Sequence, residues 1–103
     1  MSIQITNGSA KQIKWATDII NGFFSQINGV IDVEEKCHHD ATPYRTLRER
    51  FAKWLEAGAQ TMGGSLAAGW VINNRYALAN ALNEMQRDEL KQAGRLGGYH
   101  FKA

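Results

Sequence analysis

Four consecutive residues carry the side-chain types that most often bind zinc or supply a reactive thiol: Cys37, His38, His39 and Asp40. A structural zinc ion needs four ligands that converge on it as a tetrahedron. Neighbouring side chains point about 100° apart on a helix and to opposite faces of a strand, so these four cannot close on one ion. Because the only other histidine is His100 and no second ligand pair follows, we expect no metal site and no cofactor.

The same residues could also form a cysteine nucleophile and its base, with Cys37 beside His38 or His39. A reactive thiolate needs a base or a cation next to the thiol. The fold usually brings a catalytic cysteine and histidine together from distant parts of a chain, and no known signature surrounds Cys37. We therefore expect a protein that is not an enzyme, with cysteine chemistry as an alternative.

A set of basic residues provides candidate contacts to a binding partner: Arg45, Arg48, Lys53 and Arg75. Tyr44 and Tyr76 stand beside two of them, and arginine interleaved with aromatic residues is typical of surfaces that stack on nucleic acid. Glu49 and Glu56 interrupt the basic run, however, and a helix with a mixed-charge exposed face is the simpler interpretation. Nucleic acid is therefore an alternative partner and not the expected one.

The composition fits one small domain that covers residues 1–103. The chain is 44% hydrophobic and 21% charged, and its single cysteine cannot form an internal disulfide. Its apolar runs are too short to span a bilayer, and no basic-then-apolar leader opens it, so we expect a cytoplasmic protein without membrane contact. Three basic against five acidic residues give residues 1–40 a charge of −2, and nine against five give residues 41–103 a charge of +4.

Apolar periodicity predicts that the first part of the chain is helical. Ser9 and Gln12 form a capping box, in which each side chain accepts a hydrogen bond from the other residue's backbone N–H. Apolar residues then recur at steps of three and four, as one face of a helix requires, until Asn28-Gly29 gives a signal to stop. Residues 30–41 are predicted to form a separate short helix.

Three further segments complete the expected set of elements. Thr42-Pro43 predicts the start of a helix, because proline in the first turn loses no needed hydrogen bond, and Gly58 predicts its end. Residues 66–72 are apolar on all sides and are expected at the centre of the core. A last helix is predicted from about Arg75 to Ala93.

A minor pair of strands is also expected, at the two ends of the sequence. Ile3 and Ile5 alternate with polar neighbours, and residues 96–101 alternate weakly and could either fray or pair beside them. The sequence thus predicts a mainly α, compact bundle of four or five helices, with an N- and C-terminal strand pair. Much of the core area is expected from the three tryptophans, Trp15, Trp54 and Trp70.

Two segments carry motifs that belong together. Residues 8–16 read Gly-Ser-Ala-Lys-Gln-Ile-Lys-Trp-Ala, and residues 69–75 read Gly-Trp-Val-Ile-Asn-Asn-Arg. The first resembles the G-S-x-K-Q-[IV]-x-W-A opening of a set of small proteins from phages, prophages and other bacterial mobile elements. The second is similar to that set's later motif, an aromatic or aliphatic pair followed by I-[DN]-N-R. The set resembles an anti-CRISPR protein that inhibits a type I CRISPR–Cas system.

The resemblance implies a non-enzymatic accessory protein of a phage or mobile element, acting in the cytoplasm of a bacterial host cell. Such a protein binds and inhibits a host defence complex, here as an anti-CRISPR inhibitor of a CRISPR–Cas effector. Both motifs also have structural interpretations, with Trp15 and Trp70 in the core and Asn74 and Arg75 tying the last helix to the rest. A small nucleic-acid-binding protein of phage replication or regulation is the alternative, because residues 41–103 are basic.

Overall fold

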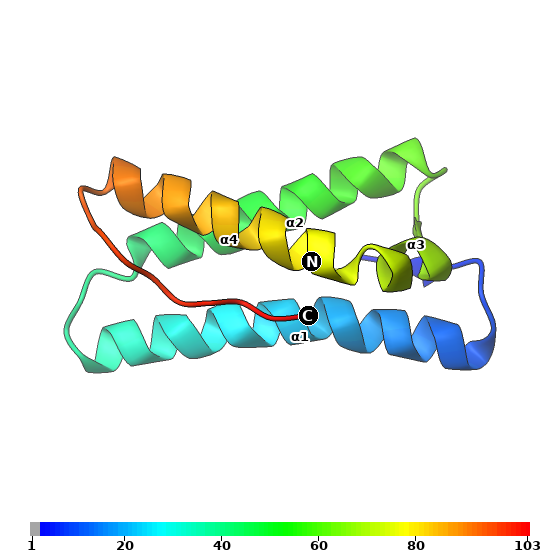
Figure 1. Cartoon of the computed structure of the whole chain (residues 1–103), viewed down its shortest axis with the longest axis horizontal. Helices are drawn as coiled ribbons and strands as arrows, with labels where there is room; N and C mark the ends of the chain where they lie inside the picture. Colours follow the sequence, from blue (N-terminus) through cyan, green and yellow to red (C-terminus); the bar gives the residue numbers. More distant parts are fainter. Residues whose placement is uncertain (1–2) are drawn as a thin grey trace.

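The computed structural model describes residues 3–103, which form a helical bundle with one short strand pair (Figure 1). The elements follow in the order β1 (Ile5–Thr6), α1 (Ala10–Lys36), α2 (Thr42–Thr61), β2 (Leu66–Ala67), α3 (Ala68–Asn73) and α4 (Arg75–Gln92). The three long helices lie side by side in a body of 43 × 23 × 22 Å. The predicted mainly α bundle with a minor strand pair is confirmed. Across residues 3–103, no helix has both the length and the apolar character needed to cross a bilayer.

Helix α1 starts as predicted and runs further than predicted. Ser9 Oγ accepts the Gln12 N–H at 3.2 Å, and Gln12 Oε1 accepts the Ser9 N–H at 2.9 Å. The expected stop at Asn28-Gly29 is wrong, as is the separate helix at residues 30–41, because α1 continues to Lys36. Val30 and Ile31 are buried on the same stripe as the earlier apolar residues, so their packing keeps the helix intact past the glycine.

Helix α2 begins at Thr42 as predicted, with Pro43 in its first turn. The carboxylate of Asp40 accepts the Thr42 N–H at 3.0 Å. Hydrogen bonding to the Thr42 side chain, and then to its backbone N–H, holds the pKa of Asp40 below its usual value. The predicted end at Gly58 is wrong, because Ala59 still packs in the core and the helix continues to Thr61. Helix α4 covers Arg75–Gln92, close to the predicted range.

The strand pair forms with a different partner from the one predicted. Strand β1 pairs in parallel with β2, with Ile5 beside Leu66 and Thr6 beside Ala67. Part of the predicted central apolar segment is therefore strand, and α3 begins only at Ala68. The pairing expected with residues 96–101 is wrong, because that segment lies along α1 and α4 instead.

The core lies between the long helices and uses phenylalanine and aliphatic residues in place of the predicted tryptophans. Phe23 of α1 and Phe51 of α2 meet edge to face, with ring centroids 5.7 Å apart. Trp15 is 50% exposed and Trp54 is 41% exposed, while Trp70 is only partly buried. The prediction that the tryptophans supply much of the core is therefore wrong for Trp15 and Trp54.

Residues 99–102 run extended between α1 and α4, where three side-chain amides hold them (Figure 1). Each amide donates to the carbonyl and accepts from the N–H of one residue, as a neighbouring strand would. The distances are 2.6 and 2.8 Å for Gln86 with Tyr99, 3.0 and 2.9 Å for Asn83 with Phe101, and 2.7 and 2.9 Å for Gln26 with Lys102. The Phe101 side chain is 1% exposed. We call this filled space between α1 and α4 the closed groove.

Candidate functional site

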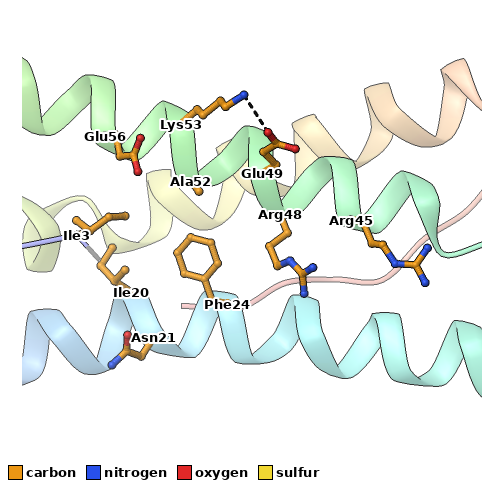
Figure 2. A pocket seen from close by; sticks show the side chains of 10 residues that line it. All are labelled: Ile3, Ile20, Asn21, Phe24, Arg45, Arg48, Glu49, Ala52, Lys53 and Glu56. Atoms are coloured by element: carbon orange, nitrogen blue, oxygen red, sulfur yellow. Dashed lines mark ion pairs between the residues drawn. The ribbon is translucent and has the colours of Figure 1, made fainter. Parts of the chain in front are cut away.

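A second groove lies between α1 and α2 (Figure 2), and residues 3–103 do not fill it. It has a volume of about 750 Å³, in the range of ligand and peptide sites. In Figure 2, α4 lies behind α2, so this groove opens on the face away from α4. Its lining residues are Ile3, Ile20, Asn21, Phe24, Arg45, Arg48, Glu49, Ala52, Lys53 and Glu56. We call this space the open groove.

The floor of the open groove is apolar. Ile20 and Ala52 are buried at its base, and Phe24 rises from α1 into its centre (Figure 2). The Phe24 ring packs against Phe51 with centroids 5.6 Å apart and keeps part of its surface exposed. Because the helix α2 side chain opposite Phe24 is the small Ala52, the two helices leave space between them.

The rim of the open groove is charged, and two of its charges lack an opposite partner. Arg45 pairs with Glu35 of α1 at 2.6 Å, and Lys53 pairs with Glu49 at 3.0 Å. Arg48 donates only to the neutral amide oxygen of Asn28, at 2.7 Å. Within residues 3–103, neither Arg48 nor Glu56 forms an ion pair.

The structure brings three of the four predicted contact residues together. Arg45, Arg48 and Lys53 all line the open groove, with the arginines directed toward α1 and the Lys53 ammonium directed away from the floor (Figure 2). Arg75 is not part of this groove. Arg75 is the first residue of α4, and its guanidinium lies over Trp15, near the start of α1.

Arg75 lies close to two exposed aromatic rings. Its guanidinium carbon is 5.3 Å from the ring centroid of Trp15 and 4.8 Å from that of Tyr76. Its Nη1 donates to the Ile72 carbonyl at 2.6 Å, which fixes the guanidinium in place. Trp15 is 50% exposed and Tyr76 is 66% exposed. We call Trp15, Arg75 and Tyr76 the aromatic–arginine cluster.

The two sequence motifs meet at this cluster. Trp15 belongs to residues 8–16 and Arg75 to residues 69–75. The start of the first motif also lies close to the residue before the second, since a Cβ added at Gly8 would lie 2.9 Å from the Cβ of Ala68. Asn74 donates to the Trp70 carbonyl at 2.8 Å, so the predicted ties of Asn74 and Arg75 to the rest of the chain are confirmed as hydrogen bonds.

Sequence reasoning missed the cluster because it placed Trp15 in the core. The buried residues of α1 include Ala16, Ile19, Ile20, Phe23 and Ile27, and Trp15 lies on the flank of this stripe, one turn before Ile19. Ile19 on this flank is buried and Trp15 is half exposed, so the flank position alone does not decide whether a side chain faces the core.

The Cys37–Asp40 segment forms the exposed turn between α1 and α2. His39 Nδ1 lies 2.8 Å from Glu34 Oε2, and Arg95 donates to the other oxygen of this buried carboxylate at 3.2 Å. The Cys37 side chain is exposed. No group of three or more His, Cys, Asp or Glu side chains in residues 3–103 is arranged to hold a metal ion. Residues 37–40 therefore form a turn that is held to the end of α1 by the contact between His39 and Glu34.

Comparison with known proteins returns no relative. No family model matches the chain, and none of the curated proteins or solved structures compared with it is similar to it. The resemblance carried by residues 8–16 and 69–75 therefore stays a prediction. The open groove and the aromatic–arginine cluster are the two surfaces from which a function can be argued.

Proposed function

We propose that this protein is a non-enzymatic binding protein of a phage or mobile element that inhibits a host defence complex, as an anti-CRISPR inhibitor of a CRISPR–Cas effector. One observation supports the proposal above all. Trp15 and Arg75 come from the two separate motifs, and their side chains stack on each other at the surface. A pair that serves only the core has no reason to leave the indole half exposed.

The chemistry of the aromatic–arginine cluster suits a protein partner. Tryptophan, tyrosine and arginine are the residues that most often dominate the binding energy of protein interfaces. Arg75 is already fixed by two rings and by the Ile72 carbonyl, so little side-chain freedom is lost when a partner binds. Within residues 3–103 no carboxylate pairs with Arg75, which leaves its charge free for an acidic group on the partner.

This proposal narrows the predicted contact set. Of the four residues Arg45, Arg48, Lys53 and Arg75, only Arg75 belongs to the cluster, and Trp15 and Tyr76 join it. The partner we propose is a subunit of the effector that presents a carboxylate beside apolar surface. Binding there would block the effector by occupying a surface that it needs, in a ratio of one inhibitor to one site.

The test is plating of a CRISPR-targeted phage on cells that express the protein, in hosts with different native CRISPR–Cas systems. We expect plating to rise in at least one system, and Trp15→Ala and Arg75→Ala to abolish the rise. Arg87→Ala is the matched control, because Arg87 is an exposed arginine of α4 outside the cluster. Circular dichroism of each purified variant shows whether the helical fold is retained. Plating that never rises, or that falls equally with Arg87→Ala, contradicts the proposal.

A further inference from the structure

We infer that the open groove binds the open groove of a second copy of this chain, with the two α2 helices antiparallel and crossing at Ala52. This inference goes beyond the proposed function and does not depend on it. It rests on the positions of three residues of α2: Arg48, Ala52 and Glu56.

The three residues are spaced evenly along one side of α2. Steps of four residues keep them on the same stripe of the helix. At 1.5 Å per residue, Arg48 and Glu56 are about 12 Å apart along the axis, with Ala52 midway. A two-fold axis through Ala52 therefore places Arg48 of each copy opposite Glu56 of the other. Such an interface is self-complementary, as two-fold symmetry requires.

Among the charged residues that line the open groove, those at these two positions are the ones without an ion pair within residues 3–103. Arg45 and Lys53 on the same rim already have carboxylate partners at 2.6 and 3.0 Å. Arg48 and Glu56 have none within residues 3–103, and both are exposed. They have opposite signs and equal distances from Ala52, so one symmetric contact neutralises all four charges of two copies.

The side chain at the crossing point leaves room for the second copy. Ala52 is buried at the base of the open groove and is the smallest side chain that lines it, so at this level the groove has space for side chains of the second copy. The approaching helix would cover the exposed part of Phe24 and the partly buried Ile3 on either side of the crossing. A second copy would therefore cover the apolar surface of the open groove, as residues 99–102 cover that of the closed groove.

The charge pattern also favours a second copy over nucleic acid. Glu49 and Glu56 stand on the rim together with the basic residues, and they would repel a phosphate backbone. An unrelated amphipathic helix could match one end of the groove, but only a second copy matches both ends by symmetry.

The experiment is sedimentation equilibrium of the whole chain over a wide concentration range. We expect the average mass to rise from 11.5 kDa toward twice that value for the wild type. Arg48→Glu alone and Glu56→Arg alone each set like charges opposite each other twice, so each variant is expected to stay monomeric. An equimolar mixture of the two variants is expected to dimerise again, because one copy then carries two carboxylates and the other carries two guanidinium groups.

Arg87→Glu is the matched control, since it makes the same charge change on α4 outside the groove, and it is expected to dimerise like the wild type. Circular dichroism confirms that each variant is folded before it is sedimented. A wild type that stays monomeric at all concentrations overturns the inference. So does a mixture that stays monomeric, or single variants that dimerise as well as the wild type. Phage plating plays no part in this result, so it is read independently of the proposed function.

Discussion

The two grooves on either side of α1 differ in what covers them. The closed groove holds residues 99–102 through three amides that act on the backbone as a neighbouring strand would. The open groove has an apolar floor and a charged rim, and its volume of about 750 Å³ is not filled by residues 3–103. In the closed groove, the backbone N–H and C=O groups of Tyr99, Phe101 and Lys102 have hydrogen-bond partners. On the rim of the open groove, two side-chain charges have no partner of opposite sign within residues 3–103. The chain thus fills the groove between α1 and α4 with its own residues 99–102, and it leaves the groove between α1 and α2 at its surface.

The largest expected effect is a loss of unfolding free energy when a phenylalanine is removed, and it should differ between Phe101 of the closed groove and Phe24 of the open groove. Phe101→Ala should lower the free energy of unfolding by about 3–5 kcal/mol, because the ring is 1% exposed and leaves a cavity. Phe24→Ala should cost only about 1–2 kcal/mol, because part of that ring already faces solvent. Urea unfolding of both variants measures the difference. Equal losses would show that the open groove is packed as tightly as the closed one.

The next effect concerns the amides of the closed groove. Gln86 is 5% exposed, accepts hydrogen bonds from the Tyr44 hydroxyl and the Tyr99 N–H, and donates to the Tyr99 carbonyl. Gln86→Leu leaves those groups without partners and should cost about 2–3 kcal/mol. Gln60→Leu on the exposed side of α2 is the control and should change stability by less than about 0.5 kcal/mol. Similar losses in urea unfolding would mean that the amide contacts do not hold the segment.

A smaller effect follows from the buried phenol beside the closed groove. Burial, together with the charge of Glu34, raises the pKa of Tyr44 from 10.0 to about 12. The unfolded chain therefore releases this proton at lower pH than the folded chain does. The stability linked to it is fully present below about pH 10 and is lost as the pH rises toward 12, by about 2 kcal/mol. Unfolding free energies measured across this range should fall less steeply for Tyr44→Phe than for the wild type, and parallel curves would contradict the assignment.

The smallest effect tests α1, the wall that both grooves share. A Cβ added at Gly29 meets no atom within 4 Å, and its backbone is helical, so Gly29→Ala should raise stability by about 0.5–1 kcal/mol. Gly94→Ala is the opposite control, because Gly94 has a φ of 71° and alanine there is strained. Thermal unfolding of both variants gives the signs. A loss of stability for Gly29→Ala would mean that α1 does end where the sequence signal placed its stop.

Much of the fold could be predicted from local signals. The Ser9 capping box and the Thr42-Pro43 start depend only on neighbouring residues, and both helices begin where those residues stand. Helix ends were harder to predict, because Gly29 and Gly58 are tolerated wherever buried residues beyond them keep the helix packed. A glycine stop signal is worth about 1 kcal/mol, which the burial of one or two aliphatic side chains exceeds.

The surfaces could be predicted only in part. Arg45, Arg48 and Lys53 share a groove because they share one helix, so their grouping was visible in the sequence. The stacking of Arg75 on Trp15 joins residues 60 positions apart and depends on how α1, α3 and α4 pack, which no local pattern encodes. The closed groove was equally hidden, because Gln26 and Lys102 meet only after the helices are in place.

Helix α1 presents Phe24 to one groove and Gln26 to the other, only two positions apart. If occupancy of both spaces depends on the position of this shared helix, the two occupancies are thermodynamically linked, and the linkage acts equally in both directions. Any molecule whose affinity for the open groove depends on the position of α1 will alter, by the same coupling free energy, how firmly residues 99–102 are held on the far side. Hydrogen exchange at the Lys102 amide can therefore report binding to a surface that this residue does not touch.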